Sequence, residues 1–148
     1  MPTTPESSWA LDTNILVYAT AIDAPPEKQR IAQRLLEQLF FSPLGCLAGQ
    51  VLSEYLSVVL RRKVMTPALA LEAVTTWSHA ARILDASVDT YEQAWKLAAT
   101  HKYQVWDALI IAVCAAHGVK TLFSEDAGSL KRPLGVQLIN PFATSTSV

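Results

Sequence analysis

Long apolar runs and a secretion signal are both missing from this chain of 148 residues. No stretch of 18 consecutive apolar residues occurs, so the sequence predicts no membrane span. The N-terminal residues MPTTPESSW also lack the charged and then apolar order of a signal peptide. We therefore expect a cytoplasmic protein that has no contact with a membrane.

Cysteine and histidine are too few and too scattered to build a zinc site. Cys46 and Cys114 lie far apart in apolar surroundings, without the close spacing of zinc or redox motifs. The histidines, His79, His101 and His117, also lack ligand spacing. The sequence predicts two reduced core thiols and ordinary histidines at the surface or at helix ends.

An excess of positive charge is absent as well. The chain has 12 Lys and Arg against 13 Asp and Glu, so any contact with nucleic acid depends on local basic clusters. The apolar fraction of 51% and the length are enough for one domain core and too little for two. We expect a single domain over residues 1–148, with a core at about 9–139 and short flexible termini.

Short apolar runs alternate with helical patterns along the chain. Strands are predicted over residues 8–12, 45–49, 82–86 and 119–123, with an edge strand over 136–139. Helices are predicted over residues 13–21, 26–41, 50–63, 67–81, 89–102 and 105–118. This alternation indicates an α/β fold, a three-layer α/β/α sandwich with a mostly parallel central sheet of four or five short strands.

Two helix starts carry capping signals. Thr66 is followed by a proline at the first helical position, which is typical of a helix start. Asp89 and Glu92 are predicted to close a capping box for the helix over 89–102.

Four acidic residues follow the predicted strands or lie early in the helices after them, where open parallel sheets bind ligands. They are Asp12, Glu54, Asp107 and Asp126. Asp107 is the only charge between Tyr103 and Ala115, and a lone carboxylate on such an apolar helix is costly to bury. We expect the four carboxylates to meet at one rim of the sheet.

Each acid also has a structural explanation: Asp12 as a helix cap, Glu54 as a solvated helix residue, Asp107 as a partner of the helix dipole and Asp126 as a turn residue. Together, however, the carboxylates would repel one another by about 1 to 4 kcal/mol per close pair. A hard cation such as Mg²⁺ or Mn²⁺ removes that repulsion and commonly works on phosphates. The acids therefore indicate metal-assisted phosphoryl chemistry.

The acids lie in the segments LDTNILVYA, QVLSEYLSVVLRRK and WDALIIAVCAAHGVKTLFSED. These segments and the order of strands and helices resemble the PIN-domain ribonucleases, and most of all the VapC-type toxins of bacterial type II toxin-antitoxin pairs. The similarity spans about residues 9–139. It implies a PIN-like fold and an endoribonuclease that depends on Mg²⁺, for which Mn²⁺ can substitute. It also implies an RNA substrate, a homodimer and a cognate antitoxin protein.

The resemblance further implies a set of site residues. Asp12, Glu54, Asp107 and Asp126 would be the catalytic metal ligands, and Asn14 and Ser124 would support them. The adjacent acid Glu125 leaves the fourth ligand open. If the strand continues through Asp126, then Ser124 and Asp126 share one face and Glu125 points to the other, which favours Asp126.

Arg61 is the candidate for substrate binding. It follows Glu54 by seven residues, about 20° away on the same helical face, and Gln50 and Ser57 join that stripe. We expect Arg61 to contact an RNA phosphate. Its alternative role, shared with the two basic residues that follow it, is to stabilise the carboxyl end of the helix.

Two other α/β protein classes with an aspartate after the first strand match fewer residues of this sequence than the PIN-domain ribonucleases do. A HAD-type phosphatase needs a second aspartate where this chain has Asn14, and a receiver domain matches only the isolated Asp12. The alternative that stays open is a PIN-fold protein acting as a non-catalytic platform that binds protein or RNA.

Overall fold

The computed structural model describes residues 4–126 and 130–143, and the outer parts of the termini predicted to be flexible, residues 1–3 and 144–148, lie outside them. The strands are β1 (Trp9–Leu11), β2 (Gly45–Ala48), β3 (Arg82–Leu84), β4 (Thr121–Phe123) and β5 (Gln137–Ile139). The helices are α1 (Thr13–Thr20), α2 (Pro26–Phe41), α3 (Gly49–Arg62), α4 (Pro67–Ala80), α5 (Val88–His101) and α6 (Val105–Ala116), with a short 3-10 turn, η1, over Pro133–Gly135. The predicted order of elements is confirmed.

The five strands form one sheet in the order β3-β2-β1-β4-β5, and every neighbouring pair is parallel. β1 is the central strand, and β5 is at an edge, as predicted. The chain builds the sheet outward from β1 to β2 and β3, and then returns to the other side of β1 with β4. The carboxyl ends of β1 and β4 therefore lie at the point where the strand order reverses, which is where open α/β sheets bind ligands.

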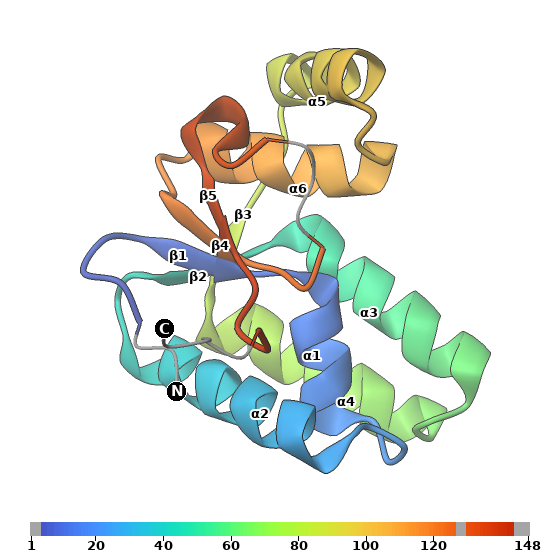
Figure 1. Ribbon diagram of the computed structural model, residues 1–148. Coiled ribbons are helices and arrows are strands. Elements are labelled where there is room, and N and C mark those ends of the chain that lie inside the picture. The colour runs from blue at the N-terminus through green and yellow to red at the C-terminus, as the bar shows by residue number, and fades with distance from the viewer. Residues whose placement is uncertain (1–3, 127–129, 144–148) are drawn as a thin grey trace.

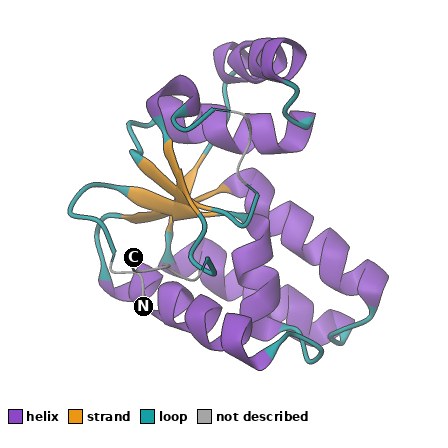
Figure 2. Ribbon diagram, viewed as in Figure 1, coloured by secondary structure: helices purple, strands orange, loops and turns teal. Residues whose placement is uncertain are grey.

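Helices cover both faces of the sheet (Figure 1). One face carries α5 and α6, and the other carries the layer formed by α1, α2, α3 and α4 (Figure 2). The predicted three-layer α/β/α arrangement is confirmed. None of the helices within the described residues is long and apolar enough to cross a membrane.

The core lies along the central strands. Trp9 and Phe123, on neighbouring strands, are almost fully buried and meet edge to face with ring centroids 5.9 Å apart. α6 is buried continuously from Ala108 to Cys114, which explains its nearly uniform apolar sequence. Cys114 and Cys46 are buried free thiols, as predicted.

One of the two predicted helix caps is correct. Thr66 caps α4 by accepting a hydrogen bond from the backbone N–H of Leu69. The capping box predicted for Asp89 and Glu92 is wrong, because α5 begins one residue earlier than expected. Ser87 is its N-cap, and Ser87 and Thr90 accept hydrogen bonds from each other's backbone N–H.

Candidate active site

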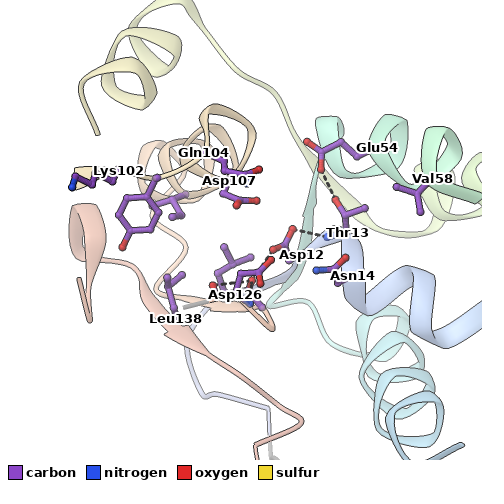
Figure 3. Close-up of a pocket in the computed structure, with 14 residues that line it drawn as sticks. Asp12, Thr13, Asn14, Glu54, Val58, Lys102, Gln104, Asp107, Asp126 and Leu138 are labelled. Carbon is purple, nitrogen blue, oxygen red and sulfur yellow. Dashed lines mark hydrogen bonds between the residues drawn. The ribbon is translucent and has the colours of Figure 1, made fainter. Parts of the chain in front are cut away.

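An acidic cleft of about 410 Å³ opens at the carboxyl ends of β1 and β4. It is lined by the four predicted acids together with Asn14 and Ser124. Figure 3 shows Asp12, Asp107 and Asp126 around one opening, with Glu54 reaching it from α3. Residues that are far apart in the sequence therefore share one concave surface.

Asp12 is the most buried of these acids, with 6% of its surface exposed. Its backbone N–H bonds to the carbonyl of Phe123 at 2.9 Å, which extends the β1–β4 pairing to the rim of the cleft. One carboxylate oxygen accepts from the N–H of Thr13 at 2.6 Å, and the other accepts from the Ser124 hydroxyl at 2.7 Å. Burial raises the pKa of Asp12, and these two hydrogen bonds oppose the rise. Asp12 thus caps α1 and also lines the cleft, so its structural explanation and its predicted placement are compatible.

Glu54 is held by two polar side chains from α1 and α3. The Thr13 hydroxyl donates to one carboxylate oxygen at 2.8 Å, and the Gln50 amide donates to the other. The same Gln50 amide donates to the backbone carbonyl of Trp106 at 3.0 Å, which links α3 to the start of α6. Thr13 was not predicted as a site residue, although it lies between two residues that were, Asp12 and Asn14.

Asp107 projects from the first turn of α6 and is half-buried. Burial is the main cause that raises its pKa to about 6, and repulsion from the charges of Asp12, Asp126 and Glu54 adds to it. The three other carboxylates are therefore near enough to disfavour ionisation of Asp107. This crowding of negative charge is the main electrostatic feature of the cleft.

The cleft contains Asp126 and not Glu125 among its lining residues. The condition that the strand continues through Asp126 is not met, because β4 ends at Phe123 and the chain bends at Glu125. At this bend the Ser124 hydroxyl accepts a hydrogen bond from the backbone N–H of Asp126 at 3.2 Å. Glu125 is held elsewhere, 2.5 Å from the Lys28 ammonium and bonded to the Tyr18 hydroxyl at 2.8 Å.

A second groove, of about 640 Å³, adjoins the acidic cleft and shares Glu54 and Asp107 with it. Gln50, Ser57 and Arg61 line this groove, so the predicted stripe on one face of α3 is confirmed as a surface beside the acids. Arg61 is exposed there and does not line the acidic cleft itself. Lys102 was not predicted as a site residue. It lines the cleft on the side opposite Glu54 (Figure 3).

The donor set of the cleft fits a hydrated hard cation. Its acids supply only oxygen ligands, which suits Mg²⁺ or Mn²⁺ and does not suit zinc. The ion pairs found join Lys28 to Glu125, Arg30 to Glu27 and Arg62 to Asp23, and none of these neutralises a cleft acid. Within residues 4–126 and 130–143, no group of three or more Asp, Glu, His or Cys side chains could hold a metal ion as arranged. Mg²⁺ is compatible with that arrangement, because it keeps several waters and is commonly bound through one or two carboxylates.

Open α/β sheets bind their ligands at this switch point. The acidic residues there favour a positively charged ligand, such as a metal ion. The profile of the PIN domain family matches residues 10–133, so this chain belongs to the PIN domain family. A search of curated proteins gave no match.

Solved structures with the same fold include toxins of the VapC type. The toxin VapC20 from Mycobacterium tuberculosis, described as cleaving the sarcin-ricin loop, is 24% identical, with a TM-score of 0.67 over 81% of this chain and 91% of that chain. VapBC2 from Rickettsia felis, bound to a promoter DNA fragment, is 22% identical, with a TM-score of 0.65 over 89% of this chain and 97% of that chain. A toxin-antitoxin complex from Klebsiella pneumoniae is 20% identical, with a TM-score of 0.65 over 90% of this chain and 98% of that chain.

Proposed function

We propose that this protein is an endoribonuclease dependent on Mg²⁺ or Mn²⁺, and that it is the VapC-type toxin of a toxin-antitoxin pair. The observation that carries the proposal is the environment of Asp107, which is half-buried beside the charges of three other carboxylates. Four acids kept at one rim, with no neutralising ion pair among the described residues, are unfavourable for folding alone. A bound cation would compensate for that cost.

Asp12, Glu54, Asp107 and Asp126 are the residues that would hold the cation, one or two of them directly and the others through its waters. When bound, the cation would lower the pKa of a water and offset charge on the oxygens of a phosphodiester. The chain's own contribution is to orient these ligands, because hydrogen bonds from neighbouring side chains limit how a carboxylate can turn.

Two hydroxyl side chains support that orientation, and Asn14 is the proposed third supporting residue. Ser124 donates to Asp12, Thr13 donates to Glu54, and Asn14 lines the cleft beside them. Both hydroxyls hold oxygens of the ligands from the side of the protein. The remaining carboxylate lone pairs stay available to a cation or its waters.

RNA is the proposed substrate, and the groove beside the cleft is its proposed path. Arg61 lines that groove together with Glu54 and Asp107, so a phosphate bound to Arg61 would lie next to the acids. The description of VapC20 as a toxin that cleaves the sarcin-ricin loop supports this substrate class. The overall charge of −1 makes such a local contact necessary, since no global positive field attracts RNA.

The proposed partners are a cognate antitoxin protein and a second copy of the chain. The toxin-antitoxin complexes from Klebsiella pneumoniae and Rickettsia felis have the same fold and support the antitoxin partner. Action on RNA inside the cell would place the protein in the cytoplasm.

A cleavage assay on a pool of cellular RNAs tests the proposal. The pure protein is incubated with the pool in Mg²⁺ or in EDTA, and new 5′ ends are mapped, with Asp107→Asn as the matched control. Discrete ends that require both Mg²⁺ and Asp107 would support the nuclease. RNA binding without any Mg²⁺-dependent ends would contradict it and favour the non-catalytic platform.

A further inference from the structure

We infer that Trp106 is a stacking platform for one unpaired RNA base next to the cleaved phosphate, an inference that rests on the proposed ribonuclease function. It adds a specificity residue to the groove that holds Arg61. The ligand class is a single-stranded nucleotide, recognised by its base plane together with its phosphate.

The first observation is the exposure of Trp106 beside the acidic residues. Trp106 lines the groove together with Arg61 and Asp107, and the residue is 62% exposed. By contrast, Trp9 and Trp77 are buried at 0% and 6% exposure. Scattered exposed apolar residues are normal on protein surfaces, so the exposure matters here because it occurs beside the acids.

The second observation is that the backbone of Trp106 is fixed relative to the acidic residues. The Gln50 amide donates to the carbonyl of Trp106 at 3.0 Å and also to the carboxylate of Glu54. Trp106 directly precedes Asp107 in the first turn of α6, a helix that is buried over most of its length. The indole is therefore attached to the same rigid element as a proposed ligand, which reduces the entropy lost when a base stacks on it.

The third observation is the composition of the rest of the groove. Ser53, Ser57 and Gln50 give it polar walls on α3, and Arg61 adds a cation that can pair with a phosphate. An aromatic ring combined with a basic side chain is the arrangement by which proteins bind single-stranded nucleic acid. Bases inside a duplex are already stacked on one another, so this groove suits an unpaired nucleotide in a loop or a single strand.

Binding of a fluorescein-labelled RNA oligonucleotide tests the inference. Affinities for a single-stranded 12-mer and for a hairpin stem of the same composition are measured by anisotropy in Ca²⁺, and a gel afterwards verifies that the RNA is intact. The variants are Trp106→Ala, Trp106→Leu and Trp106→Phe. Trp95→Ala is the matched control, because Trp95 is 55% exposed on α5 and does not line the groove.

We expect Trp106→Ala and Trp106→Leu to weaken binding of the single strand about tenfold, the scale of one lost stacking contact. Trp106→Phe keeps a ring and should retain most of the affinity, while Trp95→Ala should change it less than about twofold. Binding of the hairpin stem should change little in every variant.

Several results would overturn the inference. Unchanged affinity in both ring-deleting variants would remove Trp106 from the binding site, while continued RNA cleavage by these variants would leave the nuclease proposal intact. If the ring-deleting variants lost as much affinity for the hairpin stem as for the single strand, Trp106 would not be a stacking platform for an unpaired base. A change in the oligomeric state of Trp106→Leu, measured by light scattering, would instead place the ring at an interface between copies of the chain. If the unmodified protein neither bound nor cleaved single-stranded RNA, the proposed function would fail as well.

Discussion

The hydroxyl of Ser124 donates a 2.7 Å hydrogen bond to the carboxylate of Asp12, a residue 112 positions earlier in the chain. The bond joins the ends of the two central strands, β1 and β4, at the rim where the strand order reverses. It fixes the most buried acid of the cleft and replaces one of the hydrogen bonds to water that the carboxylate loses on burial. The parallel pairing of two short strands thus brings a proposed ligand and its support together.

Replacing Ser124 with alanine should destabilise the metal-free protein. A hydrogen bond to a buried charged group contributes about 1.5 to 3 kcal/mol, so the free energy of unfolding should fall by that amount. Urea denaturation measures the change. Ser78→Ala, which removes an exposed hydroxyl bonded only to its own helix, should stay within about 0.5 kcal/mol of the unmodified protein. An equal change in the free energy of unfolding in both variants would mean that the hydrogen bond to Asp12 stabilises the protein no more than an exposed helix hydroxyl does.

Asp107→Asn should make metal-free stability less dependent on pH. Asp107 has a pKa of about 6 in the folded chain against 3.8 without its surroundings, so the folded state binds more protons between these values. Stability from this group is then full below 3.8 and decreases as the pH rises to about 6. Removing the carboxyl removes that decrease, and the variant should be at least as stable as the unmodified protein at pH 7. Urea denaturation without metal between pH 4.5 and 7.5 measures this, and failure of the variant to fold at pH 7 would make Asp107 a structural residue.

Asp126→Asn should greatly reduce the rate of RNA cleavage, whereas Glu125→Gln should leave most of it. Loss of a ligand or of its direct support commonly lowers metal affinity or activity by about 10 to 100-fold, so Asp126→Asn should cut Mg²⁺-dependent RNA cleavage by at least tenfold. Glu125→Gln weakens a partly exposed ion pair with Lys28 and should keep most of the rate. Cleavage rates on one RNA measure both. The reverse result would make Glu125 the ligand in the working state.

Arg61→Ala should weaken RNA binding and reduce the dependence of log affinity on log salt by about one unit, because one phosphate contact is lost. Metal affinity should hardly change. The neighbouring Arg62 is a natural control, since it pairs with Asp23 at 2.9 Å and does not line the groove. RNA titrations over a range of salt concentrations compare Arg61→Ala with Arg62→Ala. If the slope of log affinity against log salt is the same for Arg61→Ala and the unmodified protein, Arg61 keeps only its role at the helix end.

Much of the fold followed from local patterns in the sequence. The apolar runs at β1, β2 and β4 and the helix between Val105 and Ala116 are strong signals because they are buried on nearly all sides. The start of α5 was misplaced because Ser87, Asp89 and Thr90 are all good capping residues, and local chemistry does not choose among them.

The site was predicted less completely than the fold. The sequence places the acids after strands, but the contacts that orient them depend on pairs distant in the chain, such as Thr13 with Glu54. Glu125 shows the same limit, since its distance from the cleft follows from Lys28 and Tyr18 and not from strand alternation. Local periodicity carries no information on such partners.

Thermal unfolding during a Mn²⁺ titration tests the central claim, that the four carboxylates form one cation site. Binding to the folded chain alone should add about 2.7 kcal/mol at a hundredfold excess over Kd, which raises the melting temperature of a chain of this size by about 5 to 10 °C. Asp107→Asn should lose most of that increase although it folds, whereas Glu125→Gln should keep it. A melting temperature that does not respond to Mn²⁺, or one that responds equally in Asp107→Asn, would contradict the claim.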